Sequence, residues 1–183
     1  MKKVAILALL ALGLTISGCG NSTNPNAITT TAGGNWEAQL TGGIGPASLL
    51  TFVTKFNVTV TTGANAQPLD ITGFSFINAG SCFSNGVNTS TETGSATLNA
   101  STTGAVTGSM TYTVTSVTPP GTTLTLTSNN GVTGTTNGVV GTTGTLSNGV
   151  AQGTWTLTSS ASTSCNGTGD FLMCQGAQTC TVP

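Results

Sequence analysis

Along most of the chain, apolar and polar residues alternate with a period of two. The clearest stretches are residues 110–115, 123–127 and 154–158, where apolar side chains fall on one face and threonines on the other. Successive side chains of a β-strand point to opposite faces, so this period predicts half-buried strands and not helices. The same criterion predicts further strands at 35–41, 49–61, 69–77, 95–99, 132–146, 171–174 and 179–182.

Turn signals lie between the predicted strands. They are Pro119-Pro120-Gly121, Asn129-Asn130-Gly131, Asn148-Gly149 and Asn166-Gly167, and a further signal, Asn137-Gly138, interrupts the segment 132–146. Composition supports the same conclusion, because about 40 threonines and the 26 glycines disfavour helix, while β-branched threonine favours strands. We therefore expect an all-β fold, an antiparallel meander of about 8–10 strands that closes as a barrel or folds as a sandwich.

The first residues have a different pattern. Lys2 and Lys3 precede an apolar run over residues 4–14, and small residues follow. This order is typical of a secretory signal peptide, and the run is too short for a membrane-spanning helix. The last four residues of this region, Ile16-Ser17-Gly18-Cys19, resemble the lipobox of bacterial lipoproteins.

That resemblance implies that the signal peptide, residues 1–18, is removed and that Cys19 carries acyl chains such as palmitate on its sulfur and its new amino group. The residues directly after Cys19 are Gly20 and Asn21, without an aspartate, so the resemblance also implies the outer membrane and not retention in the inner membrane. Residues 19–34 are expected to form a flexible polar tether, and residues 35–183 a single β domain. The alternative is an ordinary signal peptide with an incidental cysteine.

Four cysteines remain after Cys19, and an even number in an exported chain favours disulfides. A zinc site would need closely spaced cysteines, often with histidine, which the chain lacks. Cys174 and Cys180 flank a short segment typical of a hairpin turn, which leaves Cys82 to pair with Cys165. The other pairing that we consider is Cys165 with Cys174 and Cys82 with Cys180.

Charged residues are scarce, with three lysines, four acids, no histidine and no arginine. Without the signal peptide, Lys55 remains against four acids, for a net charge of −3. This composition excludes a nucleic-acid partner, which needs a basic surface, and leaves no side chain for histidine- or arginine-based catalysis. We expect the acids to be solvated surface charges, and we predict no catalytic residue, metal site or cofactor. The four acids are Glu37, Asp70, Glu92 and Asp170.

Two segments contain the pattern Gly-x-Trp. Gly34-Asn35-Trp36 opens the first predicted strand, and Gly153-Thr154-Trp155 repeats the pattern near the end of the chain. The pattern resembles the first strand of lipocalins and avidins, the calycin barrels, in which the tryptophan plugs the closed end. The resemblance implies a calycin-like barrel. Biotin binding is not expected, because Ala38 stands where avidins have a polar biotin contact and the chain has only two tryptophans. The arginine that packs on the tryptophan in lipocalins has no counterpart here.

The candidates for ligand contact are aromatic residues, which can stack on sugar rings or line a barrel mouth. They are Trp36, Tyr112 and Trp155, although aromatic residues at inward positions of alternating strands more often belong to the core. We therefore expect an outer-membrane lipoprotein whose β domain is a non-catalytic module for adhesion or for a hydrophobic or glycan ligand. The alternatives are a structural cell-envelope protein without a small-molecule ligand and a hydrolase that uses paired carboxylates.

Overall fold

The computed structural model describes residues 35–41, 50–60, 65–137 and 144–176, most of which are in β-strands. The strands are β1 (Asn35–Thr41), β2 (Thr51–Asn57), β3 (Thr59–Val60), β4 (Gln67–Pro68), β5 (Asp70–Asn78), β6 (Ser90–Ala100), β7 (Ala105–Ser116), β8 (Thr122–Thr136), β9 (Gly144–Ser159) and β10 (Gly167–Gln175), and the 3₁₀-helix η2 (Thr163–Cys165) precedes β10. The predicted all-β fold is confirmed. The signal peptide, the tether with Cys19, the strand predicted at 179–182 and Cys180 lie outside the described residues.

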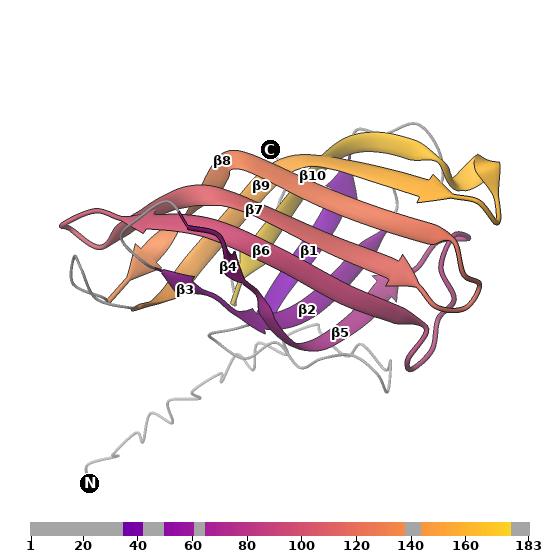
Figure 1. Cartoon of the computed structure of the whole chain (residues 1–183), viewed down its shortest axis with the longest axis horizontal. Coiled ribbons are helices and arrows are strands. Elements are labelled where there is room, and N and C mark those ends of the chain that lie inside the picture. The colour runs from indigo at the N-terminus through magenta and orange to yellow at the C-terminus, as the bar shows by residue number, and fades with distance from the viewer. Residues whose placement is uncertain (1–34, 42–49, 61–64, 138–143, 177–183) are drawn as a thin grey trace, which may run out of the picture.

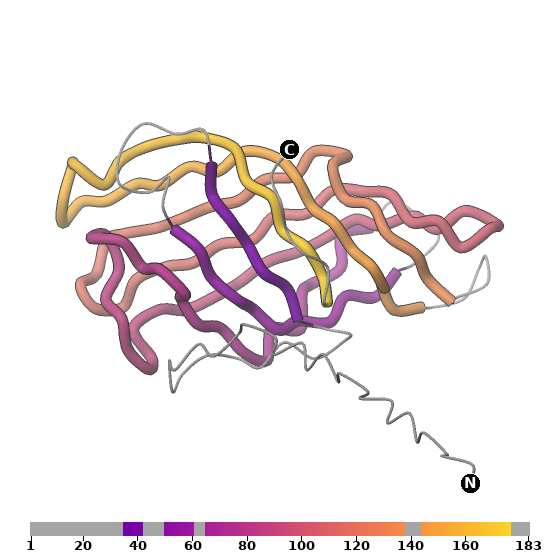
Figure 2. Tube along the Cα trace, turned by 180° about the vertical axis from the view of Figure 1, so that it is seen from behind, coloured from indigo at the N-terminus to yellow at the C-terminus, as the bar shows by residue number. Residues whose placement is uncertain are grey.

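The strands form a 10-stranded antiparallel sheet that curls into a nearly closed barrel (Figure 1). Its order is β4-β6-β7-β8-β9-β10-β1-β2-β5, with β3 paired to β9 beside this path, so most neighbours in space are neighbours in sequence, as in a meander. The first strand closes on the last, with Leu40 of β1 opposite Phe171 of β10, as the view from behind shows (Figure 2). The architecture is a barrel compatible with the calycin-like fold.

The barrel stays open along part of one seam, between β5 and β6. At the closed part, β4 pairs with β6, and the amide of Leu69 donates to the carbonyl of Gly94 at 3.0 Å. Beyond Leu69 the chain leaves β6, because β5 pairs along its length with β2 instead. The edges of β5 and β6 therefore diverge, and the segment that connects the two strands has to cover the gap.

Aromatic rings fill the interior of the barrel. Trp36 stacks on Phe56 with 4.9 Å between ring centroids, and Phe56 contacts Tyr112 at 6.0 Å. The row continues from Tyr112 through Phe52 to Phe76. Around it pack the inward apolar residues of β8 and β9, whose intervening threonines are partly or fully exposed. The predicted alternation of buried apolar residues and outward threonines is confirmed in these strands.

Two of the predicted turns, Asn129-Asn130-Gly131 and Asn148-Gly149, are wrong, because both lie inside strands. The register of β8 against β9 shifts at each of them, so the extra residues form bulges and the strands continue. Asn130 and Asn148 have φ angles of 55° and 51°, a left-handed conformation that asparagine tolerates in turns and bulges alike. Two of the other signals do mark strand ends, with Pro119-Pro120-Gly121 between β7 and β8 and Asn166-Gly167 at the start of β10. The fifth, Asn137-Gly138, begins directly after β8, and Gly138 lies outside the described residues.

A disulfide joins Cys82 to Cys165 across 83 residues, as predicted. It ties the segment between β5 and β6 to η2, and both cysteines are buried. This bond excludes the alternative pairing of Cys165 with Cys174. Cys174 is also disulfide-bonded, but Cys180 lies outside the described residues, so the pairing of Cys174 with Cys180 stays a prediction.

Candidate functional site

The three aromatic residues that we expected to contact a ligand lie in the packed interior. Trp36 is 1% exposed, and Tyr112 and Trp155 are 0% exposed. The Tyr112 hydroxyl lies 2.7 Å from Thr54 Oγ1, and Trp155 Nε1 donates to the carbonyl of Thr41 at 3.2 Å. The polar atoms of Tyr112 and Trp155 thus form hydrogen bonds between strands of the barrel. Ligand contact by any of the three aromatic residues stays a prediction.

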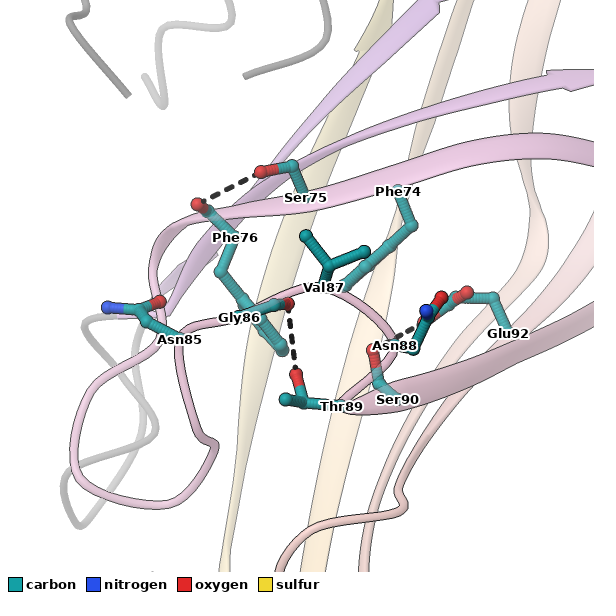
Figure 3. A pocket seen from close by; sticks show the side chains of 10 residues that line it. All are labelled: Phe74, Ser75, Phe76, Asn85, Gly86, Val87, Asn88, Thr89, Ser90 and Glu92. Atoms are coloured by element: carbon teal, nitrogen blue, oxygen red, sulfur yellow. Dashed lines mark hydrogen bonds between the residues drawn. The ribbon is translucent and has the colours of Figure 1, made fainter. Parts of the chain in front are cut away.

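A pocket of about 380 Å³ lies where β5 and β6 diverge, and we call it the seam pocket. β5 forms one wall and β6 the opposite wall, and the segment 85–89 covers the space between them (Figure 3). The lining residues are Phe74, Ser75, Phe76, Asn85, Gly86, Val87, Asn88, Thr89, Ser90 and Glu92.

The β5 wall of the seam pocket is aromatic. Phe74 and Phe76 are two positions apart on the strand and so project to the same face, where their rings meet edge to face at 4.9 Å and 88°. Phe76 is buried, whereas Phe74 is only partly buried. Val87, which comes from the covering segment, is 69% exposed and lines the same pocket (Figure 3). This wall therefore offers an apolar surface that is partly open to solvent.

The β6 wall carries a carboxyl group, that of Glu92. Glu92 pairs with Val114 of β7, which is fully buried. Paired residues of antiparallel strands point to the same face, so Glu92 points toward the interior of the barrel. Ser90 Oγ donates to Glu92 Oε1 at 2.6 Å. Burial raises the pKa of the Glu92 carboxyl, and the hydrogen bond from Ser90 offsets part of this rise.

The expectation that Glu92 is a solvated surface charge is wrong, because the residue is half-buried and faces inward. The predicted strand at 95–99 began too late, since β6 already begins at Ser90. The alternation of buried Ala96 and Leu98, extended back along β6, places Glu92 on the same face. That extension is the sequence signal that could have found this residue.

The other acids do not line the seam pocket. Asp70 and Asp170 are exposed, as expected, and Glu37 accepts a hydrogen bond from Gln39 Nε2 at 3.3 Å. Within the described residues, no second carboxyl joins Glu92 in this pocket. A glycosidase mechanism with paired acids would need one. The described part of the chain also contains no cluster of three or more histidine, cysteine or acidic residues that could hold a metal.

Tyr112 of β7 is a titratable group that interacts with Glu92. Burial raises the pKa of the Tyr112 hydroxyl, the hydrogen bond with Thr54 lowers it, and the negative charge of Glu92 raises it. The net shift is upward, so Tyr112 stays neutral at physiological pH and adds no charge to the surroundings of Glu92.

Local contacts hold the segment that covers the seam pocket. Thr89 Oγ1 donates to the carbonyl of Gly86 at 3.3 Å, and Asn88 has a left-handed φ of 60°. The amide of Val117 donates to the carbonyl of Thr89 at 2.7 Å, which joins the segment to the end of β7. Together with the disulfide at Cys82, these contacts keep the cover in place over the gap.

A smaller pocket of about 150 Å³ lies against Trp36 and Gln175. Gln175 Oε1 accepts from the amide of Gly149, and its Nε2 donates to the carbonyl of Leu146, both at 2.9 Å. Trp36 Nε1 is buried without a hydrogen-bond partner. A Cβ on Gly149 would lie 2.3 Å from the Trp36 ring, so this region is tightly packed. The seam pocket is the larger and more open of the two and is our candidate site.

Comparison with known proteins identifies no relative, because the chain matches no protein family, no curated protein and no solved structure. In the part of the chain that the structure describes, no helix has the length and apolar character of a membrane-spanning segment. The geometry and chemistry of the seam pocket are therefore the basis on which a function can be proposed.

Proposed function

We propose that this protein is a non-catalytic binding module, anchored to the outer membrane through Cys19, that takes a small amphipathic ligand in the seam pocket. One observation carries the proposal: a partly open aromatic wall faces a half-buried carboxyl in a pocket of about 380 Å³. Ligand pockets commonly have about 300–1,000 Å³, with apolar walls and a few convergent polar groups.

The packing of the interior supports this location. In an open calyx the ligand enters the middle of the barrel, but here the rings between Trp36 and Phe76 and the surrounding aliphatic side chains occupy that space. Space remains at the seam because β5 leaves β6 to pair with β2. A ligand can therefore bind at the seam without displacing the core.

An exposed apolar side chain also comes from the segment that covers the pocket. Val87 lines the pocket and is 69% exposed. Two other exposed apolar residues, Ile77 after Phe76 on β5 and Val117 after β7, do not line it. An exposed apolar side chain at a pocket is a common mark of a binding site.

Lipid attachment at Cys19 completes the proposal and follows from the lipobox. Each buried methylene of an acyl chain contributes about 0.8 kcal/mol, so two or more chains hold a protein at a bilayer without help from the folded domain. The β domain is then free to present the seam pocket to a ligand or to an adhesion partner.

A thermal-shift screen of the intact lipoprotein in non-ionic detergent, against lipid and glycan panels, tests the proposal. Val87→Trp puts a bulky ring in the seam pocket, and Val117→Trp puts the same ring at an exposed position outside its lining. A ligand at about 100 times its Kd stabilises the fold by about 2.7 kcal/mol, which raises Tm by about 5 °C or more at this size. We expect this shift in the wild type and in Val117→Trp, and its loss in Val87→Trp.

If no ligand shifts the Tm, the result would favour the structural cell-envelope protein. A shift that persists in Val87→Trp would mean that the ligand binds outside the seam pocket.

A further inference from the structure

We infer that the seam pocket takes a small organic cation, with its ammonium group facing the carboxylate of Glu92 and its alkyl groups against Phe74 and Phe76. The inference rests on the proposed function, because it names the class of ligand for the same pocket. It follows from three features of the pocket: an uncompensated carboxyl, an aromatic corner and a lining rich in hydrogen-bond acceptors.

Among the described residues, the carboxyl of Glu92 has no positive partner in its pocket. Its hydrogen bond comes from the neutral hydroxyl of Ser90, and no lysine is among the lining residues. The chain contains no arginine or histidine, and Lys55, the one lysine among the described residues, is exposed on β2. A half-buried carboxylate is costly without an opposite charge, and a cationic ligand would supply that charge.

The two phenylalanines of the β5 wall suit the rest of such a ligand. Their rings meet at 88° with centroids 4.9 Å apart, so they form two adjoining walls of a corner. The face of an aromatic ring carries negative charge density and attracts ammonium groups, and alkyl substituents on the nitrogen gain apolar contact with the same rings. A carboxylate opposite an aromatic corner is therefore favourable for an alkylammonium group.

The charge of Glu92 discriminates between classes of ligand. The other polar groups of the lining are neutral, and the amide oxygens of Asn85 and Asn88 and the hydroxyl oxygens of Thr89 and Ser90 can accept hydrogen bonds from a ligand. An anionic ligand would be repelled by Glu92. A fully apolar ligand would remove water from the carboxyl without replacing its hydrogen bonds. Only a cationic ligand supplies the opposite charge that stabilises the half-buried carboxylate of Glu92.

The inference predicts a pH dependence of binding. Burial raises the pKa of Glu92 in the free protein, whereas a bound cation stabilises the carboxylate and lowers that pKa again. Binding therefore releases a proton, and affinity rises with pH through the pKa of the free protein and then levels off. Tyr112 on β7 faces Glu92 and stays neutral, while Lys55 on β2 and Asp70 on β5 are exposed.

The experiment is isothermal titration of the intact lipoprotein in non-ionic detergent with two probes. Choline carries a quaternary ammonium group, and neohexanol is its neutral isostere, in which a carbon replaces the nitrogen. We expect choline to bind about tenfold more tightly than neohexanol at neutral pH, with an affinity that rises with pH through the raised pKa of Glu92 in the free protein and then levels off. Equal affinity for the two probes would overturn the inference.

Variants assign the effect to Glu92. Glu92→Gln keeps the size of the side chain and an acceptor for Ser90, so we expect it to weaken choline binding about tenfold and to leave neohexanol binding unchanged. Asp70→Asn removes the same charge from an exposed position outside the pocket and should change neither affinity. Equal effects of the two substitutions on choline would overturn the inference.

Failure of the proposed ligand class and failure of the proposed site give different results. If choline does not bind, but a lipid or glycan stabilises the wild type and not Val87→Trp, the seam pocket is a binding site but its ligand is not an organic cation. If choline binds equally well to the wild type and to Val87→Trp, the seam pocket itself is wrong.

Discussion

Glu92 is the side chain whose surroundings differ most from what its chemistry favours. Carboxylates are stable in water, yet this one points toward the interior of the barrel and receives its hydrogen bond from Ser90. Because burial raises its pKa, the folded protein binds a proton at this position more tightly than the unfolded chain does. The free energy of unfolding must therefore depend on pH through this group.

We expect Glu92→Gln to make the free energy of unfolding less dependent on pH. The pKa of Glu92 in the folded protein is above its unfolded value. In the wild type, the contribution of Glu92 to the free energy of unfolding is therefore fully present below about pH 4, and it is lost as pH rises through the pKa of Glu92 in the folded protein. Glutamine cannot ionise, so the variant should gain stability relative to the wild type as pH rises. Urea unfolding from about pH 4 to 8 measures this, with Asp70→Asn as the control for loss of an exposed charge. Parallel pH profiles for Glu92→Gln and the wild type would contradict the assignment.

The long strands β8 and β9 depend on bulges to follow the curvature of the barrel. A bulge inserts extra residues into one strand and increases its local bend and twist. In β8 the bulge brings the backbone at Gly131 against β9, where a Cβ would lie 2.2 Å from the carbonyl oxygen of Gln152. Glycine is required there because the neighbouring strand leaves no room for a side chain.

Gly131→Ala should therefore destabilise the fold by about 2–3 kcal/mol, since the clash is with backbone and cannot be relieved by a rotamer change. Gly86→Ala is the matched control, because its nearest neighbour would be the methyl group of Thr89 at 3.2 Å. We expect the control to cost about 0.5–1 kcal/mol, and urea unfolding compares the two variants. Equal losses would show that β8 and β9 can separate at the bulge without cost.

The disulfide joins two elements that the sheet leaves apart, η2 and the segment between β5 and β6, whose residues 85–89 cover the seam pocket. Replacing both Cys82 and Cys165 by alanine should lower the free energy of unfolding by about 4 kcal/mol, because the bridge restricts the unfolded chain. We also expect faster amide hydrogen exchange in residues 79–89 than in β8 and β9 of the same variant, since the cover loses its attachment. Unchanged exchange in residues 79–89 would mean that the hydrogen bonds around Thr89 suffice to hold the cover.

For the molecule as a whole, the proposed attachment to the membrane does not depend on the fold of the β domain. The lipobox predicts that the mature protein begins at an acylated Cys19, and intact-mass spectrometry of detergent-extracted protein can establish this. Cys19→Ala should release the protein from the outer-membrane fraction without changing its Tm, because the described β domain begins at Asn35. An unacylated terminus, or one that begins at another residue, would contradict the lipoprotein assignment.

Most of the fold was predictable because threonine and apolar residues alternate in strands such as β8, where Leu124 and Leu126 are buried. Two predicted turns were wrong because the same local backbone conformation occurs in a turn and in a bulge. Asn-Gly pairs take the same left-handed backbone in hairpin turns and in bulges, so the motifs at Asn130 and Asn148 could not be distinguished locally. Whether the motif forms a turn or a bulge depends on whether the neighbouring strand stays paired on both sides of it.

The candidate site was the least predictable part. Trp36, Tyr112 and Trp155 were correctly placed as inward residues, but the row of rings that occupies the interior depends on which strands face each other across the barrel. Glu92 could have been found only by extending the alternation of β6, and the alternation does not say whether an inward position is packed or open.

The sequence by itself determined the β fold and predicted disulfides, because alternation and cysteine number are local or compositional properties of the chain. It left two pairings open, and the structure decided that Cys82 pairs with Cys165. The tertiary structure decided that the sheet curls into a barrel, that its interior is filled, and that β5 leaves β6 at Leu69. The position of the seam pocket follows from that divergence. Which edges stay unpaired depends on how all the strands close around one core, and no single segment of the sequence encodes it.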